Sequence, residues 1–208
     1  MSMSMFAGHR GVCVRRSLAA LAAAALVAGC DGGRPSFKSI DITGAEYGKA
    51  LALTGHDGRA RTLADFQGKL VVLTFGFTHC PDVCPTTLAD VAQALTSLGR
   101  DAERVQVLFM TVDPERDTPA RLAKYVPAFD PRFLGLYGDA EATQRVAKEF
   151  KIFYDKREGS SPDSYSVDHS AQVYVLDAKG RLRLLVKHER IGADLADDLR
   201  TLLRERVG

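Results

Sequence analysis

The chain has 208 residues, of which 46% are hydrophobic and 26% are charged. These fractions are those of an ordinary soluble domain, and they exclude collagen, long disordered tails and multi-span membrane proteins. Residues 1–29 contain three arginines and no acidic residue, and the rest of the chain has 25 basic and 26 acidic residues. Because the body has no basic excess, the sequence gives no support to nucleic-acid binding.

The N-terminus has the pattern of an export signal. Arg15 and Arg16 precede an uncharged apolar run of 11 residues over 18–28. A membrane-spanning helix needs about 20 apolar residues, whereas a basic start before a run of about 7–15 is typical of a secretory signal. The run ends in Val27-Ala28-Gly29-Cys30, which resembles the cleavage box of bacterial lipoproteins, where the cysteine becomes lipidated.

These features predict the organisation of the chain. Residues 1–29 are expected to form a lipoprotein-type signal peptide, and residues 30–40 a linker that tethers the folded domain, 41–208, to a membrane. A lipidated Cys30 would hold the domain at the periplasmic face of the bacterial inner membrane. The alternatives are a signal peptide that is cut at a nearby Ala-x-Ala-like position and an uncleaved anchor.

The body alternates strands with helices. Two continuous apolar runs predict strands that are buried on both faces, and an Asp-Gly pair predicts a hairpin turn near the N-terminal end. This order indicates an α/β class with a thioredoxin-like fold, in which helices flank a central mixed sheet and an N-terminal hairpin is added. The expected elements are a hairpin over 51–62, a strand over 70–76, a helix over 85–98 opened by Pro85, a strand over 105–112, a helix over 119–126 capped by Thr118, a short strand over 133–137, a helix over 140–150, a loop over 159–163, a hairpin over 171–186 and a closing helix over 193–206.

The cysteines of the body are too few to form a disulfide scaffold. Cys13 falls in the predicted signal peptide and Cys30 in the lipidation box, so only Cys80 and Cys84 remain. A domain of this size buries a sufficient core without disulfides, and the pair is therefore expected to perform chemistry. Because a central strand leads directly into this segment, the pair is placed at the carboxyl end of that strand, where open α/β sheets position their sites.

Two thiols that converge at a strand-to-helix turn can form a disulfide or hold a soft metal. Zinc usually requires four ligands, and this body supplies only two cysteines. Copper(I) is satisfied by two or three soft ligands, and thiolates suit it. Cys84 is expected at the N-terminus of a helix, whose partial positive charge favours a thiolate. A third ligand would be a histidine that the fold brings to the pair.

The five histidines are not equivalent candidates. His9 lies in the predicted signal peptide, His56 in an exposed turn, and His188 at a strand end on the surface. His79 adjoins Cys80, but neighbouring side chains tend to diverge. His169 precedes the strand whose entrance faces the cysteine loop in a thioredoxin-like layout, so it is either the third ligand or a hydrogen-bonded loop histidine.

Other polar and soft side chains near these motifs have less specific interpretations. Asp113 ends the second buried strand beside the cysteine loop, where it either forms a turn before Pro114 or serves as a supporting group of the site or a docking group for a partner. Arg116 and Asp117 are expected to form a helix-start cluster on the surface. Met110 carries a soft thioether, but it lies in a predicted buried strand and is expected to pack in the core. Asp168 would point away from the side of His169 if the segment is extended.

Three separated motifs together resemble the Sco/SenC family. They are Phe-Gly-Phe-Thr-His-Cys-Pro-Asp-Val-Cys-Pro over 75–85, Val-Asp-Pro-Glu-Arg-Asp-Thr over 112–118, and Val-Asp-His-Ser over 167–170. The similarity extends in order over about residues 45–205, and three motifs rarely match together by chance. Many relatives keep a transmembrane anchor, whereas this chain carries the lipidation box, so the departure concerns the anchor and leaves the site motifs intact.

The resemblance implies a membrane-tethered, thioredoxin-like domain that takes part in assembling the binuclear copper site of cytochrome c oxidase. It implies one copper ion, Cu(I) or Cu(II), held by Cys80, Cys84 and His169. The implied partner is the copper-bearing subunit of the oxidase, and another periplasmic copper chaperone is a further candidate partner. The lipidation box adds the membrane, through Cys30.

Two functions from different classes share the cysteine pair. The leading hypothesis is a copper metallochaperone, which is not an enzyme in the sense of catalytic turnover. The alternative is a thiol–disulfide oxidoreductase that reduces the copper-site cysteines of the oxidase subunit. These hypotheses differ over His169, because stable copper binding requires it and redox exchange does not. A peroxidase on the same fold is disfavoured because the sequence lacks a Thr-x-x-Cys arrangement at either cysteine.

Overall fold

The computed structural model describes residue 1, residues 35–159 and residues 164–205. The predicted signal peptide, Cys30 and most of the predicted loop over 159–163 lie outside these residues. Within the described residues, no helix combines the length and the apolar character that crossing a membrane requires.

The elements are β1 (Ile40–Asp41), β2 (Ala52–Gly55), β3 (Ala60–Thr62), η1 (Leu63–Phe66), β4 (Leu70–Gly76), α2 (Val83–Leu98), η2 (Gly99–Arg104), β5 (Val105–Thr111), α3 (Pro119–Tyr125), η3 (Val126–Ala128), β6 (Leu134–Tyr137), α4 (Ala140–Glu149), β7 (Tyr154–Arg157), β8 (Ser166–His169), β9 (Val173–Leu176), β10 (Leu182–Val186), η4 (His188–Arg190) and α5 (Ile191–Arg204).

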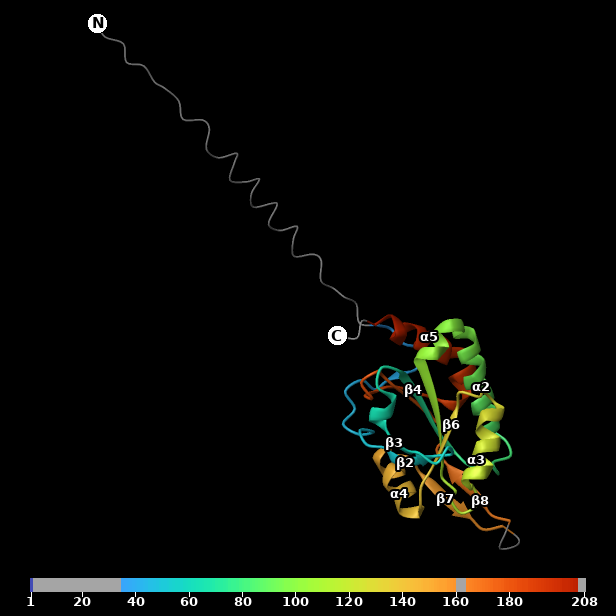
Figure 1. Cartoon of the computed structure of the whole chain (residues 1–208). Helices are drawn as coiled ribbons and strands as arrows, with labels where there is room; N and C mark the ends of the chain where they lie inside the picture. Colours follow the sequence, from blue (N-terminus) through green and yellow to red (C-terminus); the bar gives the residue numbers. More distant parts are fainter. Residues whose placement is uncertain (2–34, 160–163, 206–208) are drawn as a thin grey trace. The chain divides into compact units, whose positions relative to one another are not determined.

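The main sheet is mixed, as the sequence predicts. Its eight strands follow the order β1-β10-β9-β4-β5-β6-β2-β3. Strands β4, β5 and β6 run parallel, and β9 pairs antiparallel with β4. Helices α2 and α5 pack against each other along one side of the sheet, and α4 lies on the other side (Figure 1). The expected α/β class with a thioredoxin-like fold is confirmed.

The two central strands are buried because layers cover both faces of the sheet. All seven residues of β4 are buried, and β5 has six buried residues of seven. A strand in this position needs no polar face, which explains the continuous apolar runs in the sequence. The N-terminal hairpin is confirmed as well: β2 pairs with β3, and Gly58 supplies the positive φ of 78° that the turn requires.

Several boundaries and elements differ from the prediction. Helix α2 begins at Val83, two residues before Pro85, so Pro85 lies in the first turn rather than at the first position. Helix α5 begins at Ile191 rather than at residue 193. A second, two-stranded sheet of β7 and β8 was not predicted, because its strands carry charged and polar residues at most positions and lack an apolar run.

Residues 38–40 are held against α5 and the edge of the main sheet. The Asp198 carboxylate of α5 accepts the backbone N–H groups of Lys38 and Ser39 at 2.8 and 2.9 Å. Strand β1 then pairs with β10 at the edge of the main sheet. Asp198 is only 1% exposed, and these two backbone donors satisfy its carboxylate.

Candidate metal centre

The cysteine loop connects the central strand β4 to helix α2. Strand β4 ends at Gly76, and Cys80 lies in the loop that follows, where its N–H donates to the carbonyl of Phe77 at 3.2 Å. Cys84 lies in the first turn of α2. The pair therefore stands at the carboxyl end of a central strand, where the sequence places it.

His169 reaches this pair from the end of β8. The ligand atoms of Cys80, Cys84 and His169 all lie within 4.8 Å of one another. Nε2 of His169 is 3.3 Å from Sγ of Cys84, and Nδ1 lies 3.0 Å from the carbonyl oxygen of Ser170. Because a carbonyl only accepts hydrogen bonds, Nδ1 carries the proton and the lone pair of Nε2 faces the sulfur. An outer contact that fixes the imidazole tautomer in this way is typical of metal-binding histidines.

The position of the Cys84 sulfur depends on a glycine in β4. A Cβ atom at Gly76 would lie 2.5 Å from Sγ of Cys84 and 3.0 Å from the ring of Phe109. Both of these neighbours are buried, with Cys84 3% exposed and Phe109 fully buried. The absence of a side chain at residue 76 is what lets the sulfur rest against the backbone of the central strand.

The two thiols have opposite electrostatic environments, and the expectation of a thiolate at Cys84 is wrong. The hydrogen bond between the two side chains, together with backbone N–H donors at the start of α2, lowers the pKa of Cys80 to about 4. One of these donors is the N–H of Cys84, at 3.4 Å from Sγ of Cys80. The same side-chain hydrogen bond, with burial, raises the pKa of Cys84. The helix N-terminus thus acts on the sulfur that lies in front of it rather than on the buried sulfur within its first turn.

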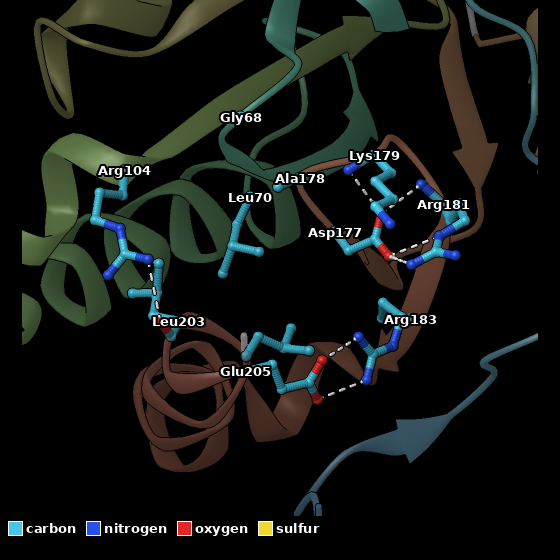
Figure 2. Close-up of a pocket in the computed structure, with 11 residues that line it drawn as sticks. Gly68, Leu70, Arg104, Asp177, Ala178, Lys179, Arg181, Arg183, Leu203 and Glu205 are labelled. Atoms are coloured by element: carbon cyan, nitrogen blue, oxygen red, sulfur yellow. Dashed lines mark hydrogen bonds and ion pairs between the residues drawn. The ribbon is translucent and has the colours of Figure 1, made fainter. Parts of the chain in front are cut away.

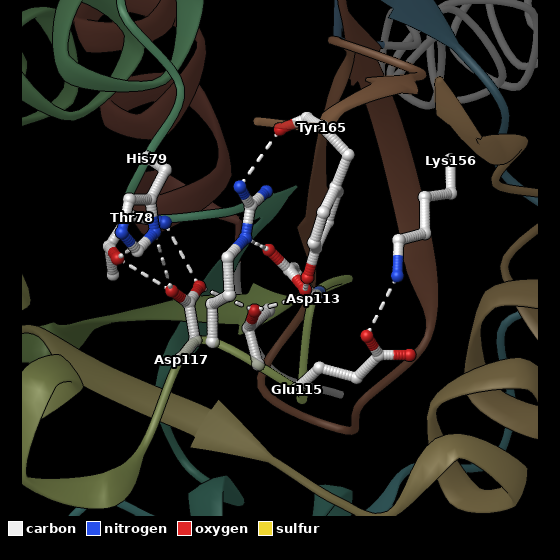
Figure 3. A network of polar contacts seen from close by, with 9 residues as sticks. Thr78, His79, Asp113, Glu115, Asp117, Lys156 and Tyr165 are labelled. Atoms are coloured by element: carbon white, nitrogen blue, oxygen red, sulfur yellow. Dashed lines mark hydrogen bonds and ion pairs between the residues drawn. The ribbon is translucent and has the colours of Figure 1, made fainter. Parts of the chain in front are cut away.

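A buried aspartate holds the start of the cysteine loop, and the prediction of a surface role for Asp117 is wrong. Its carboxylate accepts the Thr78 N–H at 2.9 Å, the Thr78 hydroxyl at 2.5 Å and the Thr111 hydroxyl at 2.6 Å (Figure 3). Asp117 is 1% exposed. It therefore joins the loop after β4 to the end of β5.

Asp113 and Arg116 form a second polar connection beside the centre. Arg116 is mostly buried, which contradicts the predicted surface cluster, and its Nε donates to Asp113 Oδ2 at 2.5 Å. Asp113 Oδ1 accepts the Tyr165 hydroxyl at 2.8 Å. The turn and the supporting role of Asp113 both hold: its carbonyl accepts the N–H groups of Arg116 and Asp117 in the turn around Pro114, and its carboxylate binds Arg116 and Tyr165.

The other described histidines and the methionine that the sequence brought into consideration do not belong to the three-residue group. Nδ1 of His56 accepts the N–H of Gly135 at 2.9 Å, so His56 is half-buried rather than exposed. His188 is half-buried too, and its Nδ1 lies 2.8 Å from the hydroxyl of Thr87. His79 is exposed beside Asp117 and does not join the three-residue group. Met110 is fully buried in the core, as predicted.

A cavity of about 120 Å³ lies at the opposite end of β4, beside Leu70 (Figure 2). Its acidic residues are paired: Glu205 binds Arg183 through both oxygens, and Asp177 binds Arg181. It contains none of the three candidate metal ligands and is unrelated to their chemistry.

Two sulfurs and one imidazole nitrogen at this spacing suit a soft ion that accepts few ligands. Copper(I) fits this donor set, and copper(II) also accepts thiolate and imidazole ligands. The same two thiols can alternatively be oxidised to a disulfide, which would remove both from metal binding. Fold and site together define a thioredoxin-like domain with a Cys-x-x-x-Cys loop and a distant histidine that converge on one point.

Comparison with known proteins identifies the family. The family model described as SCO1/SenC matches residues 41–204, and the chain belongs to this family. The mitochondrial SCO2 homologue of Bos taurus is 39% identical over 171 residues, which cover 81% of this chain and 64% of the relative. The chain thus spans less than two thirds of that relative's length.

Solved structures agree with this assignment. The copper-bound ScoI of Bradyrhizobium japonicum is 37% identical, with a TM-score of 0.69 over 75% of this chain and 99% of the other. The apo Sco1 protein of Thermus thermophilus is 41% identical, with a TM-score of 0.73 over 82% of this chain and 99% of the other.

Proposed function

We propose that this protein is a copper metallochaperone that delivers copper to the binuclear copper site of cytochrome c oxidase during its assembly. The observation that carries the proposal is the convergence of two sulfurs and one imidazole nitrogen within 4.8 Å. A relative with 37% identity has been solved with copper bound, and the Sco family is described as one of cytochrome c oxidase assembly proteins.

Copper is cargo in this proposal, and Cys80, Cys84 and His169 are its ligands, one ion per domain. Cys84 is buried against β4, whereas Cys80 is half-buried and accessible to an incoming ligand. A thiolate of the acceptor, the copper-bearing subunit of the oxidase, would therefore replace Cys80 first. A second periplasmic copper chaperone would load the site by the reverse exchange. No substrate is turned over, so the protein is not an enzyme in this function.

A thiol–disulfide reductase is the second candidate, and the low pKa of Cys80 favours it. The Cys80 thiolate would attack a disulfide of the oxidase subunit, forming a mixed disulfide and releasing one thiolate of the subunit. Cys84 would then displace the second thiolate of the subunit and close the Cys80–Cys84 disulfide. Two electrons pass from this pair to the subunit, which becomes able to accept copper.

Replacing His169 with Ala separates the two functions. Copper(I) tolerates two thiolates, so some binding of this ion survives, whereas binding of copper(II) is expected to fall most because this ion prefers nitrogen donors. The thiol pair loses its contact with His169 but keeps the N–H of Cys84 at the start of α2 in front of Cys80, so it is expected to remain able to oxidise and reduce. Under limiting copper, delivery predicts that H169A cells fail to mature the oxidase. Full oxidase activity with H169A, combined with loss of activity in C80A, would replace delivery with the reductase function.

We further propose that the mature protein begins at a lipidated Cys30 on the periplasmic face of the bacterial inner membrane. The short apolar run and the Val-Ala-Gly-Cys box support this location. Mass spectrometry of the purified native protein is expected to find a lipid-modified Cys30 at the N-terminus. An unmodified N-terminus downstream of residue 30 would contradict the proposal.

A further inference from the structure

Arg116 is mostly buried between two aromatic rings that belong to different parts of the fold. Its guanidinium carbon lies 3.5 Å from the ring centroid of Tyr165 and 5.6 Å from that of Phe77. Its side chain is 19% exposed. Arginine stacks on aromatic faces through its planar guanidinium, a contact that the ammonium group of lysine does not reproduce.

Hydrogen bonds fix the orientation of this guanidinium. Nε donates to the carboxylate of Asp113, and Nη1 donates to the backbone carbonyl of Tyr165 at 2.8 Å. The Tyr165 hydroxyl donates to the other oxygen of the same carboxylate (Figure 3). Arg116, Asp113 and Tyr165 thus form a closed set of contacts between the loop after β5 and the residue that precedes β8.

Side-chain contacts and short connections to α4 and β9, rather than strand pairing, hold the hairpin of β7 and β8 against the main sheet. Its strands pair with each other and form a sheet separate from the eight-stranded one. Among the described residues, no strand pairing therefore ties the hairpin to the main sheet. Tyr165 is placed directly before β8, and His169 is the last residue of that strand. Holding Tyr165 thus contributes to the placement of the imidazole at the other end of the strand, together with the short connection from His169 to β9.

Phe77, the second aromatic neighbour of Arg116, contacts the imidazole of His169 directly. Phe77 is the first residue after β4, at the start of the cysteine loop, and is 2% exposed. Its ring meets that of His169 edge to face, with centroids 5.8 Å apart and an interplanar angle of 88°. One guanidinium therefore contacts both the loop that carries Cys80 and Cys84 and the hairpin that carries His169.

We propose that Arg116 is a positioning residue of the metal centre, which holds His169 in register with the two cysteines. The inference rests on the proposed copper function, because it assigns Arg116 to the support of that site. It predicts that the loss of copper affinity in an Arg116 variant depends on the presence of His169. A residue with a merely structural role would affect the two cysteines as well.

The test uses R116K, which keeps the positive charge. This substitution removes the stacking of the guanidinium on Tyr165 and its two directed hydrogen bonds, to the Asp113 carboxylate and to the Tyr165 carbonyl. Arg157 supplies the matched control, since it is an exposed arginine on the same hairpin with ion pairs to Asp155 and Asp168. In competition titrations with a chromophoric copper chelator, R116K is expected to bind copper about 10–100-fold more weakly, the usual effect of losing the support of a metal ligand. R157Q is expected to bind as wild type.

A double-mutant cycle decides whether the effect passes through His169. In an H169A background, R116K is expected to cause no further loss of copper affinity, and the midpoint potential of the thiol pair is expected to stay unchanged. An equal loss of copper affinity with and without His169 would overturn the inference, as would wild-type affinity in R116K.

A copper-free measurement keeps this result separate from the proposed function. In the NMR spectrum of the reduced protein without copper, R116K is expected to shift the ring resonances of His169 and to weaken the nuclear Overhauser contact between His169 and Phe77. Unchanged resonances and an unchanged contact would refute the positioning role whether or not the protein binds copper. If these signals change while H169A binds copper as wild type, the three-ligand copper site fails and the positioning of His169 stands.

Discussion

Replacing Gly76 with Ala tests whether the missing side chain at residue 76 sets the position of the Cys84 sulfur. The new methyl carbon would lie 2.5 Å from Sγ of Cys84, whereas non-bonded heavy atoms pack at about 3.5–4.0 Å. The sulfur must therefore retreat by about 1 Å, because the other close neighbour is the buried ring of Phe109, 3.0 Å from the methyl. Overpacking of this kind costs about 1–3 kcal/mol of unfolding free energy. A displaced ligand is also expected to weaken copper binding about 10–100-fold.

Gly192 in α5 provides the control for this substitution. A Cβ atom there meets its nearest neighbour, Asp90, at 3.6 Å, which is ordinary contact. G192A, an exposed substitution in the first turn of α5, is expected to change the free energy of unfolding by no more than about 0.5 kcal/mol and to leave copper affinity unchanged. Urea unfolding gives the free energies, and chelator competition gives the copper affinities. Wild-type copper affinity in G76A would show that the sulfur position is not set by the missing side chain, and would refute the reasoning.

Two further predictions concern groups outside the three ligands. D117A leaves three donors without their acceptor. At about 1–3 kcal/mol for each buried donor, it should lower the free energy of unfolding measured in urea by at least about 3 kcal/mol. D117N keeps one acceptor oxygen and should lower this free energy less, and equal decreases in the two variants would contradict this account. Burial lowers the pKa of His56 below its ordinary value of 6.5, so the folded state resists protonation and its stability falls as the pH drops below about 6.5. The H56N variant keeps a side-chain oxygen that can accept the N–H of Gly135 but removes the titrating imidazole. Its melting temperature should fall less than that of wild type between pH 7.5 and 5.5. Equal decreases in melting temperature would exclude His56 as a source of the pH dependence.

The central part of the fold is predictable because its signals are local. The apolar runs of β4 and β5 reflect burial on both faces, which dictates composition residue by residue. The position of the cysteine loop follows directly, since it comes immediately after β4. The identity of the third ligand is less local: 85 residues separate Cys84 from His169. Position alone leaves the histidine ambiguous, and the family motifs single it out.

The roles of the supporting side chains Asp117 and Arg116 could not be predicted from the sequence, for a different reason. Asp117 and Arg116 lie in a short polar segment before a helix, where charged residues are usually solvated. Their burial results from neighbours that are remote in sequence: Thr78 lies 39 residues from Asp117, and Tyr165 lies 49 residues from Arg116. The β7–β8 hairpin, which supplies Tyr165, has no hydrophobic periodicity and gives no local signal. A prediction of these roles therefore requires the tertiary arrangement.

The candidate centre thus combines side chains associated with two separate sheets. Cys80 and Cys84 belong to a strand–helix junction within the main sheet, whereas His169 belongs to a hairpin outside that sheet's strand pairing. A small movement of the hairpin would change the number of donors from three to two without disturbing the thiols. Two thiolates suit copper(I), while an imidazole matters most for copper(II). On the proposed copper function, the contacts that hold the hairpin would therefore bear on which oxidation state the site favours. On the same proposed function, the polar segment 113–117, which contains none of the three candidate ligands, would contribute to how firmly copper is retained.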